Sequence, residues 1–423
     1  MRMFDIIDKK KHGKELTREE ISYFVKGVTS GEIPDYQTSA LLMAICFKGM
    51  TDEETAELTL AMAASGDEMD LSHLSGIKVD KHSTGGIGDK TTLILGPLMA
   101  ACHLPVVKMS GRGLGLTGGT IDKLEAIPNL SCSLSMEDFF HQVEEIGVAV
   151  ASQTASLAPC DKKLYALRDT TATVDCIPLI ASSIMSKKLA SGSDAIVLDV
   201  KYGSGAFMKT EEDAKKLATI MVTIGEHCGR RMDYVISDME QPLGQAVGNS
   251  IEVNEAVRML KGEGPQDLRE VVFQLGAKML LLGDIVSTEE EAVKLMEEHL
   301  SDGSALEKFR EMIRCQGGDA SFLDTEELLP LASYTKEILA TEDGVVTKVA
   351  ADIIGHTALD LGAGRTTKDD AVDPGSGVFV CKKVGDKVKK GEVLAKIYTS
   401  SEDGLLEAQK ECAGAFVIEG QSR

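Results

Sequence analysis

The sequence predicts an α/β protein with a small discontinuous all-helical domain, a large α/β domain with a mainly parallel central sheet, and a C-terminal β-rich subdomain. The N-terminal residues have helical periodicity, strand-like and helical segments alternate from about residue 80, and short β-rich segments follow residue 333. Alternating strands and helices are typical of a parallel sheet covered by helices. The expected boundaries are residues 1–70 and 161–192 for the helical domain, 71–160 and 193–332 for the α/β domain, and 333–423 for the β-rich subdomain.

The helical domain is indicated by capping signals and apolar spacing. Residues 17–20 read T-R-E-E, a capping box, and apolar side chains follow at i, i+3, i+4 and i+7 from Ile21. Residues 51–54 repeat the capping signal. A further helical segment at about residues 166–190 lies between strands, so we expect the chain to return to this domain.

The other two parts are indicated by short apolar segments. In the α/β domain, strands are expected at residues 104–109, 147–151 and 195–200, and helices at residues 136–146 and 211–224. In the C-terminal subdomain, strands are expected at residues 344–349, 378–382 and 393–398.

Charge and composition favour a small-molecule enzyme in a reducing compartment. The 423 residues include 45 Lys and Arg against 67 Asp and Glu, a net charge of −22 that should repel nucleic acid and anionic membranes. The nine cysteines are scattered without a CxxC pair, which argues against a disulfide framework or a zinc site. The most apolar stretch, residues 93–107, is too short to cross a bilayer. We therefore expect a cytoplasmic protein with no nucleic-acid or membrane partner.

Two glycine-rich segments have the composition of anion-binding loops. Residues 81–92 read K-H-S-T-G-G-I-G-D-K-T-T, with three glycines, four hydroxyl side chains and two lysines. Glycine lets backbone N–H groups turn toward an anion, and hydroxyls and lysine add donors and charge. Residues 108–123 read K-M-S-G-R-G-L-G-L-T-G-G-T-I-D-K and contain a GxGxxG match. Because no acidic residue follows the next expected strand to hold a ribose, a second anion loop is favoured over dinucleotide binding.

A third segment combines apolar and polar residues on one helical face. Residues 165–187 read Y-A-L-R-D-T-T-A-T-V-D-C-I-P-L-I-A-S-S-I-M-S-K. Ile180, Ser183 and Lys187 lie at i, i+3 and i+7, so a donor and a cation share a face with an apolar patch. Both a ligand-binding face and an amphipathic helix with a solvated lysine fit this pattern.

Together the three segments resemble the signature of the type II nucleoside phosphorylases, the thymidine and pyrimidine-nucleoside phosphorylase family. The matching blocks are KHSTGG, SGRGLG-TGGT-DKLE and YA-RD-TATV, and the similarity includes residues 199–208 and nearly the whole chain. The resemblance implies reversible phosphorolysis of pyrimidine nucleosides (uridine, thymidine and deoxyuridine) to the free base and (deoxy)ribose 1-phosphate, in nucleoside salvage. It also implies a homodimer whose helical domain contacts the base and whose α/β domain contacts phosphate.

The resemblance implies roles for individual residues. The implied catalytic residues are His82, Arg168 and Lys187, with His82 as the acid. The implied phosphate-binding residues are Lys81, Ser83, Thr92, Lys108, Ser110 and Thr120. The implied nucleoside-binding residues are Arg168, Ser183, Lys187, Leu114, Ile180, Ile184 and Phe207. Phosphate beneath C1′ would stabilise the pentose cation and then attack it, while the cationic side chains stabilise the departing base.

A monovalent cation, potassium, is implied by the pyrimidine-specific branch of the family. Its ligands fall on Gly88, Lys90, Leu243, Ala246 and Glu255, as main-chain oxygens and one carboxylate. The family usually has Thr in place of Lys90 and His in place of Leu116. We expect the Lys90 side chain to point outward and leave the ion in place; an inward lysine would pair with Glu255 and displace the ion.

Three other functions remain open. The first is a strict thymidine phosphorylase, although residues 107–110 look closer to the broad pyrimidine-nucleoside branch. The second is an anthranilate-type phosphoribosyltransferase, which resembles this family in fold and uses a pyrophosphate substrate with magnesium. The third is a carrier protein, because residues 384–397 resemble the turn of a lipoyl- or biotinyl-carrier domain, although no modifiable lysine is evident there.

Overall fold

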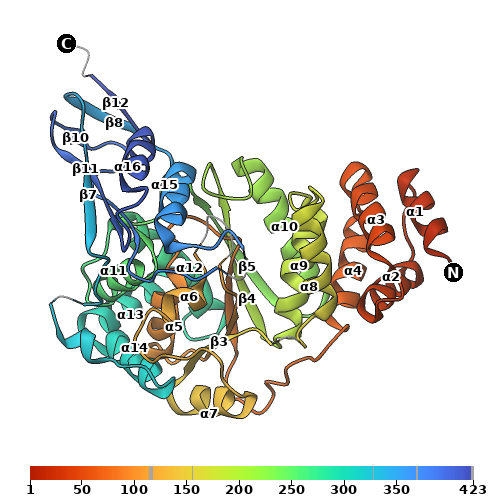
Figure 1. The fold of residues 1–423 in the computed structure, drawn as a ribbon. Helices are drawn as coiled ribbons and strands as arrows, with labels where there is room; N and C mark the ends of the chain where they lie inside the picture. The colour runs from red at the N-terminus through yellow and green to blue at the C-terminus, as the bar shows by residue number, and fades with distance from the viewer. Residues whose placement is uncertain (114–117, 155, 327, 368–369, 421–423) are drawn as a thin grey trace.

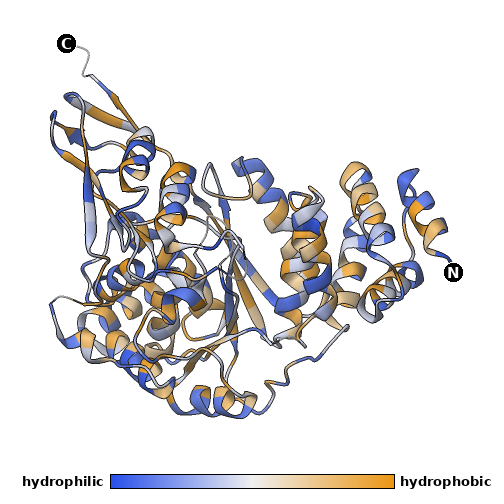
Figure 2. Cartoon of the chain, in the orientation of Figure 1, coloured by the Kyte–Doolittle hydropathy of each residue, from blue (hydrophilic) through white to orange (hydrophobic). Residues whose placement is uncertain are grey.

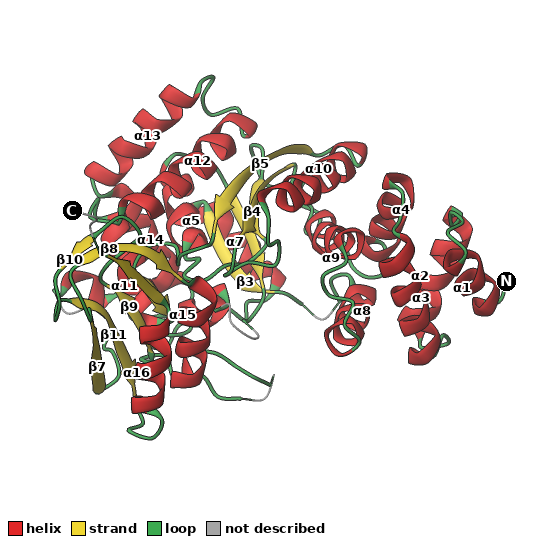
Figure 3. Ribbon diagram, turned by 90° about the horizontal axis from the view of Figure 1, so that it is seen from above, coloured by secondary structure: helices red, strands yellow, loops and turns green. Residues whose placement is uncertain are grey.

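The α/β domain lies in the middle of the molecule, with the helical domain at one end and the β-rich subdomain at the other (Figures 1 and 3). The computed structural model describes residues 1–113, 118–154, 156–326, 328–367 and 370–420. The predicted fold class is confirmed: a helical domain, an α/β domain with parallel strands and a C-terminal β-rich part are all present.

The helical domain is formed by two separate stretches of chain. α1 (Met3–Lys11), α2 (Arg18–Ser30), α3 (Asp35–Lys48) and α4 (Asp52–Ala63) come first, and α8 (Pro159–Thr170) and α9 (Ile177–Ala190) pack against them. Both predicted capping boxes are confirmed, at Thr17 before α2 and at Thr51 before α4. The expected helical segment at residues 166–190 is broken into two helices, because Ala172 has a φ of 54°, where an α-helix cannot continue.

The α/β domain contains two parallel sheets. β1 (Val79–Ser83), β4 (Ala195–Tyr202) and β5 (Arg231–Asp238) form one in the order β1-β4-β5, and β2 (Val106–Ser110) pairs with β3 (Val148–Ser152). The helices are α5 (Thr91–Ala101), α6 (Thr120–Leu124), α7 (Met136–Ile146), α10 (Glu211–His227), α11 (Ser250–Leu260), α12 (Gln266–Leu282), α13 (Glu289–Ser301) and α14 (Ser304–Cys315), followed by a 3₁₀ turn (Ser321–Asp324). Both glycine-rich loops leave the carboxyl ends of parallel strands, where α/β sheets usually bind ligands.

The C-terminal subdomain is joined to the α/β domain by a shared sheet. β6 (Ala246–Gly248) pairs with β9 (Gly377–Val380), which continues to β11 (Val393–Thr399) and β7 (Tyr334–Leu339). A second sheet contains β10 (Lys387–Val388), β8 (Gly344–Val349) and β12 (Phe416–Glu419). The helices are α15 (Ala351–Ala358), a π turn (Leu359–Ala363) and α16 (Leu405–Gly414). The β6–β9 pairing therefore connects the C-terminal subdomain directly to the segment that follows β5.

Several hydrophobic cores stabilise this arrangement. Hydrophobic and hydrophilic residues alternate along the helices of every part (Figure 2), as expected for helices that bury one face. One core lies between the helical and α/β domains, where Met185 of α9 packs with Leu198 of β4 and Leu217 of α10. No helix in the described ranges is both long and apolar enough to span a membrane. The shared core holds α9 beside the sheet and places its polar face at the domain boundary.

Candidate active site

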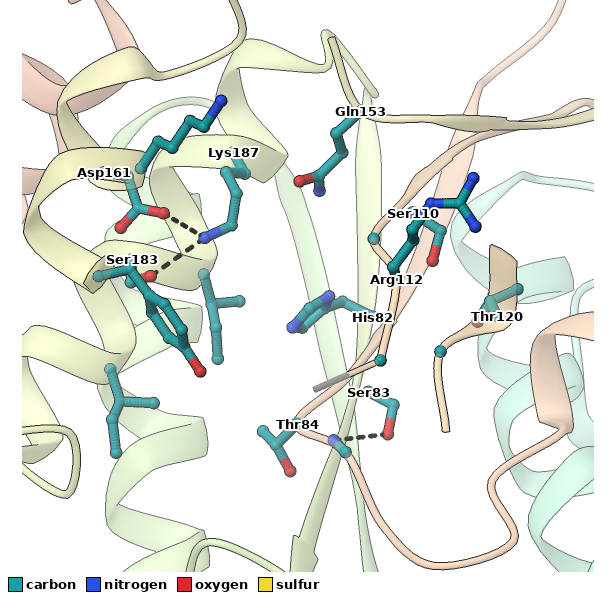
Figure 4. A pocket seen from close by; sticks show the side chains of 18 of the residues that line it. His82, Ser83, Thr84, Ser110, Arg112, Thr120, Gln153, Asp161, Ser183 and Lys187 are labelled. Atoms are coloured by element: carbon teal, nitrogen blue, oxygen red, sulfur yellow. Dashed lines mark hydrogen bonds and ion pairs between the residues drawn. The ribbon is translucent and has the colours of Figure 1, made fainter. Parts of the chain in front are cut away.

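A cavity of about 720 Å³ lies between α8 and α9 on one side and the carboxyl ends of β1, β2 and β3 on the other. Its volume is within the range of small-molecule sites, roughly 300–1,000 Å³. In Figure 4, Lys187, Ser183 and Asp161 lie on the helical side, Ser83, Ser110 and Thr120 lie on the loop side, and His82 lies between them. The cavity therefore has two chemically different walls.

Most residues that the sequence implicates line this cavity. They are His82, Ser83, Ser110, Thr120, Arg168, Ile180, Ser183, Ile184, Lys187 and Phe207. Lys81, Thr92 and Lys108 are not among its described lining residues, and Leu114 and Leu116 lie outside the described part of the chain. The structure thus brings the two loops and the helical face together, while it places two of the implicated lysines elsewhere.

Lys81 begins the first glycine loop and is not among the cavity's described lining residues; its ammonium contacts residues near the end of that loop. Its Nζ donates to Thr91 Oγ1 at 2.5 Å and lies 3.4 Å from an Asp199 oxygen. Asp89 lies at the floor of the cavity, 3.9 Å from the same ammonium. Burial opposes ionisation of Asp89, but Lys81 and Lys201 outweigh it and hold its pKa well below the usual range. The loop therefore rests on a network of fixed, buried charges.

A second group of buried charges lies behind the first. Lys108 Nζ donates to the Lys81 carbonyl at 2.7 Å and lies 3.3 Å from Asp80, which also pairs with Lys188 at 2.6 Å. Burial lowers the pKa of Lys108 to about 7, although Asp80 opposes the shift. In the two groups together, lysines 81, 108, 188 and 201 face aspartates 80, 89 and 199. Three of these lysines balance the three aspartates, and Lys108 is only partly protonated near neutral pH, so the two groups together carry a small positive charge beneath the cavity.

The second glycine loop is held by Asp122 at the start of α6. Its carboxylate accepts the Gly113 N–H at 2.7 Å and an Arg112 N–H at 3.2 Å. Arg365 of the C-terminal subdomain donates to the same carboxylate at 2.7 Å. The two ends of the loop approach so closely that a Cβ on Gly119 would lie 2.0 Å from the Gly113 nitrogen. Only glycine fits at position 119, and Thr120 follows it directly at the cavity wall.

On the helical wall, Lys187 lies in a short polar chain. Its ammonium pairs with Asp161 and donates to Ser183 Oγ at 3.0 Å. The Lys187 side chain is 21% exposed, and one carboxylate oxygen of Asp161, Oδ1, is buried without a hydrogen-bond partner among the described atoms. This wall therefore keeps unused hydrogen-bonding capacity beside the cavity.

Arg168 connects the cavity to the turn between α8 and α9. Its Nε, Nη1 and Nη2 donate to the carbonyls of Thr173, Leu179 and Val174 at 3.2, 3.0 and 2.7 Å. A guanidinium has five N–H donors, so two more can serve a ligand. Arg168 thus orients the α8–α9 connection in addition to any contact with substrate.

The surroundings of His82 favour the neutral form of its imidazole. Burial, followed by the charges of Lys188, Lys108, Lys187 and Lys81, holds the pKa of His82 well below its usual value. A neutral imidazole has one N–H donor and one acceptor nitrogen. The position of His82 between the two walls lets this single group face both halves of a bound substrate.

Several lining residues were missed by the sequence analysis. They are Thr84, Arg112, Ser152, Gln153, Thr154, Asp161, Lys162 and Tyr165. A signal for Asp161 was present, because Asp161, Tyr165 and Arg168 lie at i, i+4 and i+7 of one helix. Ser152 ends β3 and residues 153–154 follow it, at the carboxyl end of a parallel strand like both glycine loops. The rule that α/β sheets bind ligands at this end would have found them.

The residues named for potassium come together, but the expectation that Lys90 points outward is wrong. Its side chain is fully buried, and its Nζ donates to Leu243 O and Ala246 O, each at 2.9 Å. The third partner is Glu255 Oε2 at 2.5 Å. An acceptor set of two carbonyls and a carboxylate attracts an ammonium as it does a metal ion, and the lysine is already covalently in place.

Comparison with family models defines the class of protein. Residues 4–66 match the helical bundle domain of the glycosyl transferase family, and residues 75–306 match its a/b domain. The fold is also similar to the crystal structure of anthranilate phosphoribosyltransferase from Thermus thermophilus, with a TM-score of 0.59, 19% identity and coverage of 74% of this chain and 99% of that one. At this identity the likeness shows the fold alone. The helical bundle, the α/β domain and the cavity between them therefore define a member of this glycosyl transferase class.

More similar relatives identify the family. Residues 345–419 match the pyrimidine nucleoside phosphorylase C-terminal domain. The chain is 58% identical to the pyrimidine-nucleoside phosphorylase of Bacillus subtilis (strain 168) and 56% identical to that of Geobacillus stearothermophilus, covering 95% of this chain and 93% of each relative. The chain belongs to the pyrimidine-nucleoside phosphorylase family.

Proposed function

We propose that the protein catalyses the reversible phosphorolysis of pyrimidine nucleosides to the free base and (deoxy)ribose 1-phosphate, with uridine, thymidine and deoxyuridine as substrates in nucleoside salvage. The observation that carries this proposal is the division of one cavity into two walls. Hydroxyl groups and glycine-rich backbone form one wall, and Lys187, Ser183 and Arg168 form the other. Phosphate needs several converging donors, whereas the base offers two carbonyls and an N–H that match the helical wall.

In the proposed reaction, phosphate binds against Ser83, Ser110 and Thr120. Its oxygen forms a bond to C1′ as the N-glycosidic bond breaks, and the bonding electron pair leaves with the base. Arg168 and Lys187 stabilise the resulting negative charge on the base carbonyls. Asp161 keeps Lys187 oriented toward the base through the ion pair.

His82 then supplies a hydrogen bond or a proton to the base. Because burial and the nearby lysines lower the pKa of His82, a new negative charge nearby is needed to favour its protonation. A bound phosphate dianion provides that charge and raises the pKa of His82. Phosphate binding and proton donation are thereby coupled, so the base departs only when the nucleophile is present.

A homodimer in the cytoplasm completes the proposal. Tyr36 and Phe47 are 75% and 78% exposed on α3, and their spacing of about three helical turns puts them on one face. Phe4 of the adjacent α1 is 69% exposed. Exposed aromatic side chains of this kind support a contact between two copies through the helical domain. The nine cysteines are all free thiols, which supports a reducing compartment.

The direct test is a product assay with matched co-substrates. Uridine, thymidine and deoxyuridine are each incubated with the protein, with and without phosphate, and the products are separated by chromatography. We expect free base and pentose 1-phosphate only when phosphate is present. Formation of a phosphoribosyl product from anthranilate and phosphoribosyl pyrophosphate, without nucleoside cleavage, would favour the transferase instead.

A further inference from the structure

Lys90 lies at the end of the first glycine loop, immediately before α5, and its side chain crosses to a distant segment of the chain. Residues 242–246 lie at the end of the connection from β5 to β6 and at the start of β6, and the carbonyls of Leu243 and Ala246 accept hydrogen bonds from the ammonium. Both partners of the ion pair with Glu255 are buried, with side-chain exposures of 0% and 3%. The contact therefore joins a cavity-lining loop to the β6 segment and α11.

The acceptors around Lys90 leave no place for a further cation. An ammonium has three N–H donors, and Leu243 O, Ala246 O and Glu255 Oε2 accept all three. A potassium ion on the same oxygens would lie beside a buried positive charge and be repelled. The backbone of Gly88 also passes close by, because a Cβ there would lie 2.7 Å from Leu243 O. The residues present do not fit the potassium ion that the family resemblance implies.

A second lysine holds the same segment from the C-terminal subdomain. Lys383 donates to the carbonyls of Pro242 and Gly244, the latter at 2.8 Å, and pairs with Asp267 at 2.9 Å. The carbonyls at 242, 243, 244 and 246 are thus divided between two ammonium groups. Glu255 also accepts the backbone N–H groups of Gln245 and Ala246, at 2.9 and 3.2 Å. Each of these four carbonyls has a side-chain donor, so the geometry of the segment is defined by the chain itself.

We propose that Lys90 is a built-in replacement for the monovalent cation: its ammonium occupies the ion's position and permanently holds the first glycine loop to residues 242–246 and Glu255. The ammonium carries the same single charge as potassium and binds oxygens of three residues that the resemblance assigns to the ion, Leu243, Ala246 and Glu255. Because it is covalently attached, it does not depend on the salt in solution. The loop that carries Gly85, Gly86 and Asp89 to the cavity is therefore organised without a bound metal ion.

The test compares ion binding and thermal stability in three salts. The wild type, Lys90→Thr and Lys90→Met are dialysed and measured in potassium, sodium and tetramethylammonium chloride at equal ionic strength, and bound potassium is quantified. We expect the wild type to hold no stoichiometric potassium and to unfold at the same temperature in all three salts. Lys90→Thr should lose about 5 °C or more in tetramethylammonium, bind one potassium per chain, and regain most of the loss in potassium. Lys90→Met should lose stability in every salt, because its side chain supplies neither charge nor oxygen.

A matched control separates a cation site from a broken ion pair. Lys10 is 3% exposed and pairs with Glu54 at 2.7 Å, so Lys10→Thr removes a similar buried ammonium that has no backbone carbonyl partners among the described residues. Its stability should fall and should not recover in potassium. One bound potassium per wild-type chain, or a wild-type unfolding temperature specific to potassium, would overturn the proposal. Absence of potassium binding by folded Lys90→Thr would overturn it equally, and these readouts do not depend on enzymatic activity.

Discussion

Two lysine–carboxylate pairs, Lys187–Asp161 and Lys90–Glu255, show how one interaction serves different purposes. The Lys187 side chain is 21% exposed at the cavity wall, whereas the Lys90 side chain is 0% exposed beneath the first glycine loop. Lys90 has three acceptors for three donors, while Lys187 has two acceptors among the described residues. A buried ammonium whose three N–H donors are all used within the chain stabilises the structure. An ammonium at a cavity that has a donor to spare can bind a ligand.

The same contrast separates the two walls of the cavity. On the loop side, the charged groups are paired within the chain: Lys81 lies near Asp89 and Asp199, and Arg112 pairs with Asp122 and Glu125. The hydroxyls of Ser83, Ser110 and Thr120 line the cavity beside them. On the helical side, the charged ammonium of Lys187 itself lines the cavity. We therefore expect phosphate to depend on many weak donors and the base on a few strong ones.

The largest effect is expected from His82, which belongs to neither wall. His82→Ala should reduce kcat by roughly 10²–10⁴-fold, because it removes the group that donates to the departing base. The Michaelis constants for uridine and phosphate should change little. Steady-state kinetics with each substrate varied measures this, and His82→Gln, which keeps a donor without a titrating proton, should retain more activity. An increase in the Michaelis constants for both uridine and phosphate would instead show that His82 acts in substrate binding.

Substitution of Lys187 should act on one substrate. Lys187→Ala removes a charge-assisted hydrogen bond worth about 1.5–3 kcal/mol, so kcat/KM for uridine should fall about 10–100-fold, with little change in the KM for phosphate. Asp161→Asn should have the same direction and a smaller size, because Lys187 keeps its charge and its Ser183 contact. Equal losses for both substrates would contradict the division of the cavity.

Substitutions on the loop wall should have smaller effects than Lys187→Ala, and they should affect phosphate and not uridine. Ser110→Ala and Thr120→Ala each remove one hydroxyl donor to the phosphate dianion, so the KM for phosphate should rise about 10-fold while that for uridine stays within about 2-fold. Kinetics at saturating uridine measures the effect, and circular dichroism verifies folding. A larger effect on uridine than on phosphate would reverse the assignment of the walls.

The smallest effect concerns pH and stability. The pKa of His82 is lowered in the folded state, so the unfolded state takes up its proton first as the pH falls below about 6.5. This contribution is fully present above that pH and is lost as the pH falls toward the folded-state pKa. Wild-type stability should therefore decline more between pH 7 and 5 than that of His82→Gln, by at most about 1.4 kcal/mol per pH unit. Parallel urea titrations would reveal this, and identical pH profiles would contradict the neutral assignment.

Local patterns allowed much of the fold and site to be predicted. The helix at residues 136–146 is confirmed at both ends, because Ser135 caps it and Gly147 ends it in a left-handed conformation. The helical spacing placed Ile180, Ser183 and Lys187 on one face and left open whether that face binds a ligand or is solvated; in the structure it lines the cavity. Such features depend on residues within a few turns of one another, and sequence spacing reports them directly.

The direction of the lysine side chains could not be predicted in this way. Lys90 pairs with Glu255, 165 residues further along the chain, and its long stem could equally have reached solvent. Lys81 and Lys108 were expected at the phosphate site, but aspartates from neighbouring strands hold their ammonium groups beneath the loop. In each case the outcome depends on which carboxylate the folded chain brings near.

The two-wall account is tested most directly by equilibrium binding. Phosphate and uridine are each titrated separately into the wild type, Ser110→Ala and Lys187→Ala. Calorimetry of each ligand alone avoids turnover and isolates each wall. We expect Ser110→Ala to weaken phosphate binding and leave uridine binding within about 2-fold, and Lys187→Ala to weaken uridine binding about 10-fold or more while phosphate binding is retained. If both folded variants lose both ligands to the same extent, the cavity is not divided and the account is wrong.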